Sequence, residues 1–478
     1  MKNREDIVRN IESRYLVLLE NGNEIKLDLD NKEEVVSELS NIGDEQLRAY
    51  VLSEEMKSDN NLEAPSIKAM RRLEYVDYEE ASDAGHFRMY PNGQLIFDLL
   101  KDWMDEIAKN RLQAMQIESP VIYNWDDKEI REQASSFHER HYIVKVPDDP
   151  SKEFILRFAG DFGLFKMFKQ ANFSYKMLPI RVYEFSKSFR YEKRGELSGL
   201  RRLRAFHMPD IHCFCKDLKQ GIEEYKNLYK RYADLANGVG IKYAVVVRVV
   251  ESFYEEYKED LLELARYSKA PLFVECLSEM KHYWAIKHEF QSIDSINGNQ
   301  QLSTIQFDVK DAKIYGINYV DENSEKQGCI ICHSSIGSVE RWIYAVLEEA
   351  LKKEKPGLPL WLSPVQVRVI PVANDKHLEF CKKLHMEGIR YDIDDRDERL
   401  GRKIAKANQE WVPYVLVVGD NEIESGKYSI QIRGEEDKRE ISLDELVAEI
   451  KEKCEGMPYR NIAMSKYLSK RPIFVGAV

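Results

Sequence analysis

The sequence has no long run of apolar residues. None approaches the roughly 20 residues that a membrane-spanning helix needs, and the amino-terminal MKNREDIVRN lacks the apolar core of a signal peptide. We therefore expect a soluble protein of the cytoplasm. Basic residues are also in the minority, because 71 of them face 83 acidic residues and leave a net charge of −12. Any nucleic acid must then be bound by a local basic surface, which excludes a histone-like coat.

Cysteine is scarce and odd in number. Seven cysteines among 478 residues are typical of reduced thiols in the cytosol. The pairs Cys213/Cys215 and Cys329/Cys332 leave open a four-thiolate zinc site, and Cys329 to His333 has the order of a haem-attachment pentapeptide. Both pairs lie in apolar, strand-like stretches, which favours cysteines that pack as small hydrophobic side chains.

Two common nucleotide-binding motifs are missing. The sequence contains neither a Gly-x-x-x-x-Gly-Lys-Ser/Thr loop nor a Gly-x-Gly-x-x-Gly segment after a strand. The composition is that of a globular protein, with 43% apolar and 32% charged residues. Its length suits about three domains at roughly 150 residues each.

Breaks in the pattern suggest where these domains meet. Residues 15–29 form two β-prone runs around Asn21-Gly22, a hairpin signal, and helical sequence follows. The polar stretch 58–66 and the Pro- and Gly-containing stretch 352–359 resemble linkers. We predict a small α/β domain at 1–65, a central domain at 66–358 and a carboxyl-terminal domain at 359–478. Strands and helices alternate in the last of these, which predicts a compact α/β domain with a partly parallel sheet.

The central domain has many strands but few crossover helices. A helical period covers Gln94–Leu112, and further helices are expected at 217–237, 253–267 and 335–353. Strand-like segments occur at 153–159, 180–186, 202–208, 242–250, 302–308, 313–319 and 328–334. This order favours an antiparallel sheet and an α+β multidomain fold.

The densest basic stretch runs from Arg181 to Arg204. It holds eight basic residues against three acidic ones, and Phe189 and Phe206 flank its arginines. A solvated loop is one interpretation; the other is a surface for a planar base and its phosphates. The helix entry Gly337–Arg341 also places an arginine in a first turn, where the helix dipole disfavours a cation and a bound anion would stabilise it.

These segments resemble a known family. Ser188–Glu192 with Arg194–Phe206 resembles motif 2 of the class II aminoacyl-tRNA synthetases, Gly337–Arg341 resembles motif 3, and the helix that ends at Ser119-Pro120 resembles motif 1. Within that class, Thr304–Asp308, Pro209–His212 and Glu424–Lys427 are similar to threonyl-tRNA synthetases of archaeal type. The resemblance covers about residues 70–470.

The resemblance implies an antiparallel sheet of six or seven strands, and it implies roles in ATP binding. Arg190 would hold the α-phosphate, Glu192 the adenine amino group and Arg341 the γ-phosphate, while Phe206 would stack on adenine and Arg202 would also contact ATP. Arg190 and Arg341 would be catalytic, because charge develops on the phosphates as the adenylate forms, and Mg²⁺ would accompany ATP.

The same resemblance implies a zinc ion that binds threonine. Its two histidines would be His212 and His333, and Asp161 stands where the family has cysteine. A carboxylate is an accepted zinc ligand, so a site with two histidines and one aspartate is chemically reasonable. Asp210 would accept a hydrogen bond from the threonine hydroxyl. Lys287 and Gln301 would lie near the substrate.

Further expectations concern partners. The carboxyl-terminal domain would bind the anticodon of tRNA(Thr) through Arg396, Glu424 and Arg433, and motif 1 (Leu95–Arg111 with 119–121) would form a homodimer. Tyr90 stands where bacterial members have a histidine near the reacting ribose, which leaves aminoacyl transfer without an evident base. Residues 1–65 are too few for the family's editing domain, so we expect a separate deacylase that acts in trans.

Two alternatives remain at this point. A sister synthetase for serine or proline shares the class II motifs, although the pair His212 and His333 favours threonine. A paralogue that binds RNA without catalysis would also keep the fold. Retention of four residues together argues against it, since RNA binding alone does not require all of them: Arg190, Glu192, Phe206 and Arg341.

Overall fold

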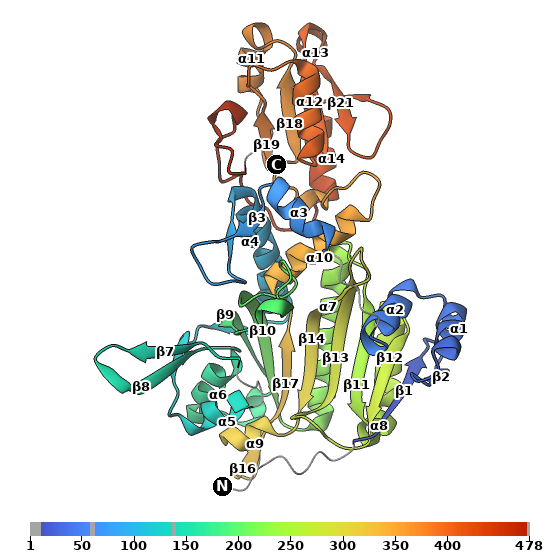
Figure 1. Cartoon of the computed structure of the whole chain (residues 1–478), viewed down its shortest axis with the longest axis vertical. Coiled ribbons are helices and arrows are strands. Elements are labelled where there is room, and N and C mark those ends of the chain that lie inside the picture. The colour runs from blue at the N-terminus through green and yellow to red at the C-terminus, as the bar shows by residue number, and fades with distance from the viewer. Residues whose placement is uncertain (1–10, 58–62, 136–139, 476–478) are drawn as a thin grey trace. The chain divides into compact units, whose positions relative to one another are not determined.

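The computed structural model describes residues 11–57, 63–135 and 140–475 (Figure 1). The chain divides into two compact units, the first made of residues 1–62, 104–196 and 203–342 and the second of residues 63–103, 197–202 and 343–478. Within the described part of the chain, no helix is long and apolar enough to cross a membrane.

The first unit is built on one large sheet. Its strands follow the order β2-β1-β12-β11-β13-β14-β17-β10-β9-β5, and all neighbours are antiparallel except the pairs β11/β12 and β5/β9. In chain order these strands are β1 (Ser13–Leu18), β2 (Glu24–Leu27), β5 (Met115–Ile117), β9 (Ile180–Phe189), β10 (Ala205–Cys215), β11 (Ala244–Val250), β12 (Leu272–Leu277), β13 (Trp284–Ile293), β14 (Asn299–Asp308) and β17 (Ile330–Ser335).

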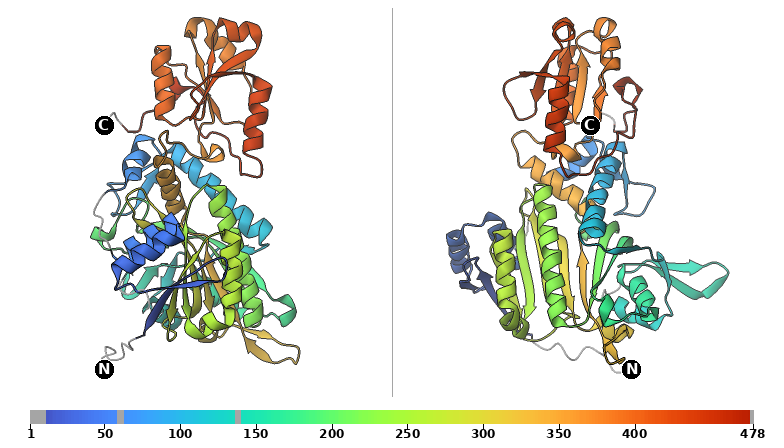
Figure 2. Two further views of the ribbon diagram at one scale, coloured as in Figure 1. Left: turned by 90° about the vertical axis from the view of Figure 1, so that its right-hand side faces the viewer. Right: turned by 180° about the vertical axis from the view of Figure 1, so that it is seen from behind.

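Helices cover both faces of this sheet. The long helices α7 (Leu218–Gly238) and α8 (Glu251–Ser268) lie along one face (Figure 2). On the other face, α1 (Lys32–Ile42), α2 (Glu45–Tyr50) and the π turn η1 (Val51–Glu55) cover the outer strands. Smaller elements complete the unit: α5 (Lys128–Ser135), α6 (Asp161–Gln170), α9 (Asp311–Tyr315), the three-stranded sheet of β6 (Ile122–Asn124), β7 (Ile143–Val146) and β8 (Asp149–Leu156), and the pair β15 (Asn318–Val320) and β16 (Lys326–Gly328).

The structure confirms the predicted antiparallel sheet for this unit, but not every predicted element. The hairpin at 15–29 forms as β1 and β2, and β1 pairs with β12, so the hairpin extends the sheet to more strands than the six or seven expected. The strand expected at 313–319 is wrong in its first part, where α9 forms. Asp308 explains this difference, because its Oδ1 accepts hydrogen bonds from the backbone N–H groups of Lys310 (2.7 Å) and Asp311 (2.9 Å) and so starts a helical turn.

The second unit contains a partly parallel sheet, as the alternating pattern predicted. Its order is β19-β18-β20-β21-β22, with β18 parallel to both β19 and β20. Its elements are β18 (Val367–Pro371), α11 (Asn374–Lys383), β19 (Tyr391–Ile393), α12 (Leu400–Gln409), β20 (Tyr414–Val418), α13 (Asp420–Ser425), β21 (Lys427–Ile432), β22 (Arg439–Ser442) and α14 (Leu443–Lys453). The unit also includes α3 (Pro65–Arg72), β3 (Val76–Tyr78) and β4 (Phe87–Met89). Helices α4 (Pro91–Asp105), which leads into the π turn η2 (Glu106–Arg111), and α10 (Val339–Leu351) belong partly to each unit.

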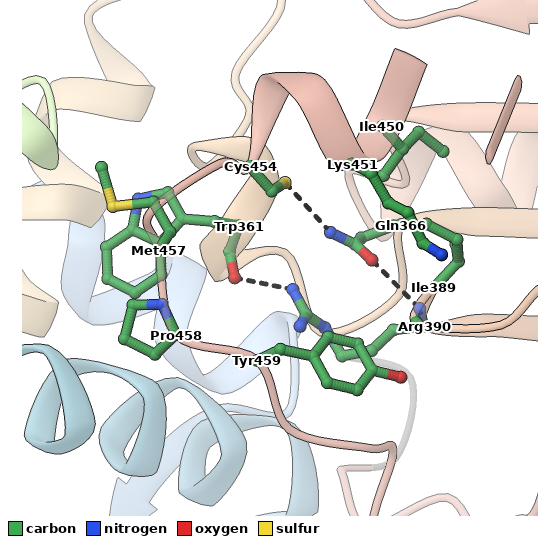
Figure 3. Close-up of a pocket in the computed structure, with 11 residues that line it drawn as sticks. Trp361, Gln366, Ile389, Arg390, Ile450, Lys451, Cys454, Met457, Pro458 and Tyr459 are labelled. Atoms are coloured by element: carbon green, nitrogen blue, oxygen red, sulfur yellow. Dashed lines mark hydrogen bonds between the residues drawn. The ribbon is translucent and has the colours of Figure 1, made fainter. Parts of the chain in front are cut away.

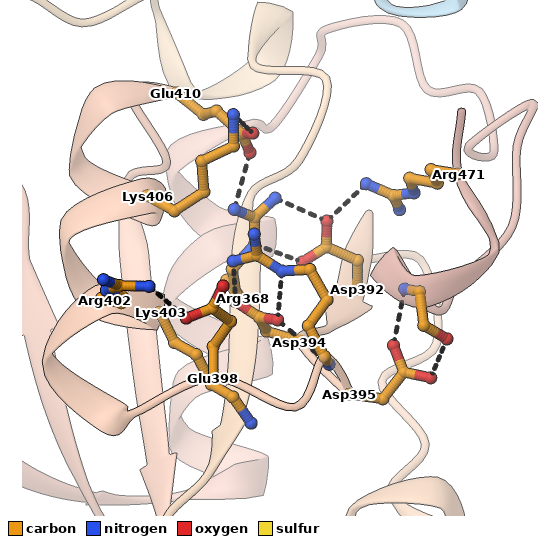
Figure 4. A network of polar contacts seen from close by, with 12 residues as sticks. Arg368, Asp392, Asp394, Asp395, Glu398, Arg402, Lys403, Lys406, Glu410 and Arg471 are labelled. Atoms are coloured by element: carbon orange, nitrogen blue, oxygen red, sulfur yellow. Dashed lines mark hydrogen bonds and ion pairs between the residues drawn. The ribbon is translucent and has the colours of Figure 1, made fainter. Parts of the chain in front are cut away.

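A buried ion network lies beside β18 and β19 (Figure 4). Arg368, 1% exposed, makes two parallel hydrogen bonds of 2.9 Å to Asp392 and an ion pair of 2.6 Å to Glu410. Burial would lower the pKa of Arg368, but the charges of Asp392 and Glu410 raise it. The guanidinium is therefore fully neutralised inside the domain, which is the condition for a buried charge to be tolerated.

Candidate functional site

One face of the large sheet collects most of the predicted site residues. Directly paired residues of neighbouring strands point to the same side, and the pairing runs Arg248–Lys287–Gln306–His333–His212 across five strands. We call this side the polar face; it also carries Arg190, Phe206, Asp210 and Gln301 by alternation and register. It is opposite the side covered by α7 and α8.

A β-bulge in β14 determines where Gln301 points. Between the pairs Glu289/Thr304 and Gln291/Gln301, β14 contains one residue more than β13. In a regular strand Gln301 and Gln306 would lie on opposite sides, because five is an odd number of steps. The extra residue restores the alternation, and both glutamines therefore share the polar face.

Arg190 and Phe206 meet at one end of this face. The guanidinium of Arg190 lies 5.2 Å from the ring centroid of Phe206, and its Nε donates a 3.0 Å hydrogen bond to the carbonyl of Phe158. Burial lowers the pKa of Arg190, and the charges of Glu192, Asp161 and Asp210 oppose that effect. A stacked, pre-oriented guanidinium beside an aromatic ring suits a nucleotide, whose base and phosphate need both groups.

Glu192 is held by neighbouring arginines. Its carboxylate forms a 2.9 Å ion pair with Arg140, and its carbonyl accepts hydrogen bonds of 2.8 and 2.7 Å from Arg204. Arg204 also stacks on Tyr191 at 4.1 Å. Arg202, by contrast, is exposed and belongs to the segment 197–202 of the second unit, so the structure does not group it with Arg190.

Arg341 lies in the first turn of α10, as the sequence predicted. Its Nη1 donates a 3.0 Å hydrogen bond to the carbonyl of Gln301, which brings motif 3 onto the polar face. Its backbone N–H donates to Oγ of Ser338 at 3.2 Å. The residue before it, Glu340, accepts a 2.7 Å hydrogen bond from His207 of β10.

Asp161, His212 and His333 converge. The two histidines are directly opposite in β10 and β17, with ring centroids 4.9 Å apart, and Asp161 Oδ1 lies 3.3 Å from His212 Nε2. One ligand atom from each residue lies within 4.8 Å of the others, close enough to share one metal ion. Burial lowers the pKa of His212. For Asp161 burial acts to raise the pKa, but the hydrogen bond with His212 lowers it.

A second group of possible ligands shares His333. Its Nε2 is 2.6 Å from Asp308 Oδ2, and Asp311 completes a buried trio. Burial would lower the pKa of His333, but the hydrogen bond with Asp308 raises it to about 9. None of the residue groups in the described ranges that could hold a metal ion contains a cysteine. The four-thiolate alternative therefore has no support, and Cys213 and Cys332 are buried partners across β10 and β17.

Asp210 and Lys287 flank this cluster on the polar face. Asp210 Oδ2 accepts a 3.1 Å hydrogen bond from Ser186, and burial together with the charge of Asp161 raises the pKa of Asp210 to about 8. Lys287 Nζ forms a 2.7 Å ion pair with Glu289. Both are thus ordered side chains close to the strands that carry the histidines.

The three predicted anticodon residues do not lie together. Arg396 follows β19, and Glu424 lies on α13, which follows β20, so both lie at the carboxyl ends of the parallel strands. Arg396 makes hydrogen bonds of 2.7 and 2.8 Å to Asp394, and Glu424 is exposed. Arg433 follows β21 next to Pro413, at the opposite end of β20. Its Nη1 donates to the carbonyl of Asn408 at 2.9 Å and its Nε to that of Pro356, so this guanidinium is held by backbone groups.

The second unit also contains a pocket of about 210 Å³ (Figure 3). Trp361, Arg390 and Tyr459 line it, and Arg390 donates hydrogen bonds to the carbonyls of Trp361 (2.6 Å) and Ser363 (3.0 Å). None of the predicted site residues lines this pocket.

Sequence reasoning missed several residues of the site. Arg140, which holds Glu192, carries no spacing signal of its own. Arg204, Gln306 and Asp308 had a signal, because they stand in the segments Arg194–Phe206 and Thr304–Asp308 quoted for the resemblance.

Comparison with known proteins places this geometry in a family. Residues 142–350 match the model of the tRNA synthetase class II core domain (G, H, P, S and T), and residues 366–453 match that of an anticodon binding domain. The RNA binding domain of threonyl-tRNA synthetase from Cryptosporidium parvum superposes with a TM-score of 0.70 at 23% identity, over 82% of this chain and 98% of that one. Prolyl-tRNA synthetase from the same organism gives a TM-score of 0.66 at 17% identity, over 80% of this chain and 73% of that one, and at these identities the likeness concerns the fold alone.

Relatives found by sequence identify the family more narrowly. A threonine--tRNA ligase from Pyrococcus horikoshii is 43% identical over 91% of this chain and 71% of the relative, and one from Pyrococcus furiosus is 41% identical over the same shares. These matches include both the class II core and the anticodon-binding region. The chain belongs to the threonine--tRNA ligase family of class II aminoacyl-tRNA synthetases.

Proposed function

We propose that this chain ligates threonine to tRNA(Thr) on the polar face, with ATP and Mg²⁺ as the family uses them. In the first step a carboxylate oxygen of threonine attacks the α-phosphorus of ATP, and pyrophosphate leaves with the bonding electrons. In the second step a ribose hydroxyl of the tRNA attacks the threonyl carbonyl, and AMP leaves. The observation that carries the proposal is the convergence of Asp161, His212 and His333 on the face that also holds Arg190 and Phe206.

Arg190, Phe206 and Arg341 are assigned to ATP. Arg190 faces the α-phosphate, where charge increases in the transition state, and Phe206 stacks on adenine. Arg341 pairs with the γ-phosphate from the start of α10. Donors that are already held in place stabilise developing charge without reorganisation, and the hydrogen bond from Arg190 to Phe158 meets that condition. Glu192 is assigned to the adenine amino group.

A zinc ion is assigned to Asp161, His212 and His333, and the residues present fit it. Two imidazoles and one carboxylate leave further coordination positions open, which is the pattern of zinc sites that bind substrate. Asp308 fixes the ring of His333 at 2.6 Å, as outer-shell carboxylates do. When bound, the ion would supply a Lewis acid for the amino and hydroxyl groups of threonine. Asp210 would accept the hydrogen bond of that hydroxyl, and Lys287 and Gln301 would face the reacting end of the substrate.

The second unit is assigned to the anticodon of tRNA(Thr). Arg396 and Glu424 share the carboxyl-terminal edge of its sheet, and unpaired bases offer hydrogen-bonding edges to such side chains. Arg433 is left out of this contact because its Nε and Nη1 are held by backbone carbonyls.

Two partner assignments follow. A second copy of the chain is assigned to the sheet edge at β5, where Met115 is 55% exposed and Val121 and Ile122 follow at 40% and 44%; an isologous dimer would cover them. For fidelity, serine has both groups that bind the metal and lacks one methyl group. That difference is worth about 10- to 200-fold in selectivity, so a separate deacylase is assigned to removing serine from tRNA(Thr).

The test is ATP–pyrophosphate exchange by the purified chain with each of the twenty amino acids. Threonine should support exchange, serine should follow weakly, and valine should be rejected because its methyl group leaves Asp210 and one coordination position of the metal without a partner. Exchange that is strongest with serine or proline would favour a sister synthetase. No exchange with any amino acid, in a folded chain that binds tRNA, would favour the RNA-binding paralogue.

A further inference from the structure

The amino-terminal segment made of α1, α2 and η1 covers the polar face over strands β11 and β12. Tyr50 and Val51 are fully buried against Val246 of β11 and Phe273 of β12, and the rings of Tyr50 and Phe273 meet edge to face at 5.9 Å. Arg248 lies two residues after Val246, on the same side of β11. The segment therefore ends next to Arg248, from which the paired polar residues of the sheet continue to His333 and His212.

A π turn brings two polar groups of this segment together. In an α-helix of about 3.6 residues per turn, positions five apart do not face the same way. The wider turn η1 (Val51–Glu55) aligns Tyr50 and Glu55, and the Tyr50 hydroxyl donates a 2.5 Å hydrogen bond to Glu55 Oε1. The carboxylate of Glu55 is thereby oriented.

Glu55 and Tyr50 contact Arg248. Its Nη2 donates to Glu55 Oε1 at 2.9 Å and to the Tyr50 hydroxyl at 3.1 Å, while its Nη1 donates to Glu275 of the neighbouring strand. Burial would lower the pKa of Arg248, but the charges of Glu289, Glu55 and Glu275 raise it. Arg248 is thus a permanent cation surrounded by three carboxylates.

One of these carboxylates is shared with Lys287. Glu289 Oε1 is 2.7 Å from Lys287 Nζ and 3.6 Å from Arg248 Nε, so its close partner is the lysine. Gln291 donates a 2.8 Å hydrogen bond to the other oxygen, and Glu289 is 4% exposed. A buried carboxylate between two cations moves toward the cation that is less well neutralised. Glu55 and Glu275 neutralise Arg248 and so leave Glu289 to Lys287.

We propose that Glu55 is a positioning residue for adenylate formation, acting through Arg248 and Glu289 to hold Lys287 at the substrate. The inference rests on the proposed function, in which Lys287 faces the reacting end of threonine. It assigns a role to the amino-terminal segment, which supplies a negative charge that neutralises Arg248. Without that charge, Arg248 draws Glu289 away and Lys287 loses its fixed position.

The test is the isosteric variant Glu55→Gln in the full chain, which keeps the shape and removes the charge. Its kcat/KM for threonine in ATP–pyrophosphate exchange should fall about tenfold, while KM for ATP changes less than about twofold. The matched control is Glu24→Gln. Glu24 also joins the amino-terminal hairpin to the rest of the unit, through Lys258 (2.6 Å) and the Tyr254 hydroxyl (2.8 Å), but it does not touch Arg248. Both variants should lower the unfolding midpoint similarly, and only Glu55→Gln should lower kcat/KM.

Lys287→Met separates positioning from a merely structural effect. If Glu55 acts through Lys287, the double variant Glu55→Gln/Lys287→Met should be no worse than Lys287→Met within about twofold. Equal activity of Glu55→Gln and wild type, or a loss that adds in full to that of Lys287→Met, would overturn the inference while leaving the proposed function intact. A fully active Lys287→Met would remove Lys287 from the proposed site and the inference with it.

Discussion

Replacing Arg190 by alanine should lower adenylate formation by at least about 100-fold, which corresponds to roughly 2.7 kcal/mol. The structure sets this scale because the guanidinium is already fixed before substrate binds. Its Nε donates a 3.0 Å hydrogen bond to the carbonyl of Phe158, and its Cζ lies 5.2 Å from the centroid of the Phe206 ring. Charge at the α-phosphate therefore meets a cation that is already oriented. Arg190→Lys keeps the charge but not the planar donor set, and we expect an intermediate loss of about tenfold.

The assay is threonine-dependent ATP–pyrophosphate exchange, with circular dichroism and the unfolding midpoint measured on the same samples. The matched control is Arg181→Ala, at the other end of β9. Arg181 makes two hydrogen bonds of 2.6 and 2.7 Å to Glu224, so its loss should lower stability and leave exchange within about threefold of wild type. A loss below about fivefold in a folded Arg190→Ala protein would refute the assignment of Arg190 to the α-phosphate.

Four further predictions concern the metal, fidelity, assembly and tRNA. Metal analysis should find about one zinc per chain, lost in His212→Ala and kept in Asp311→Asn; the reverse pattern would move the ion to the second group. The chain alone should accumulate seryl-tRNA(Thr) and should not hydrolyse it when it is added back; rapid enzyme-dependent deacylation that spares threonyl-tRNA(Thr) would contradict this. Light scattering should give twice the chain mass of 56.0 kDa, and a mass of one chain at micromolar concentration would exclude the β5 dimer. Glu424→Ala should raise KM for tRNA about tenfold with amino-acid activation unchanged, since activation precedes anticodon contact, and an unchanged KM would remove Glu424 from the anticodon site.

The local sequence pattern predicted individual helices and strands better than it predicted which strands pair with one another. The Asn21-Gly22 hairpin and the helices at 217–237 and 253–267 follow from turn chemistry and period, both of which act within a few residues. Strand β12 escaped prediction because a strand buried on both sides does not alternate. In β13, Lys287, Glu289 and Gln291 do alternate, but the polar His288 and Ser292 on the opposite side weaken the apolar half of the pattern. At 313–319 the β-prone Ile314, Tyr315 and Ile317 outweighed Asp308, whose carboxylate starts a turn.

In the candidate site, too, the sequence indicated individual residues but not which of them are neighbours. His212 and His333 could be selected from their motifs, but only the register of β10 with β17 makes them neighbours. The contact of Glu55 with Arg248 spans almost two hundred positions and depends on how α2 packs on the sheet, so no local signal announces it. Arg433 had the residue type of a base contact, yet its Nε and Nη1 donate to the backbone carbonyls of Pro356 and Asn408.

The bulge in β14 has a consequence for deletions. Loss of a single residue between Gln301 and Thr304 would remove the bulge and leave an even number of steps, so Gln301 would stay on the polar face of a regular strand. Loss of a single residue between Thr304 and Gln306 would keep the bulge but shorten the regular part of the strand by one step, and Gln301 and Gln306 would then point to opposite sides of the sheet. Such a protein would keep its secondary structure and lose a substrate-facing amide. The length of the chain, rather than the identity of any side chain, is therefore under functional constraint in this regular part of β14, and an alignment gap misplaced by one position would assign the wrong glutamine to the reaction.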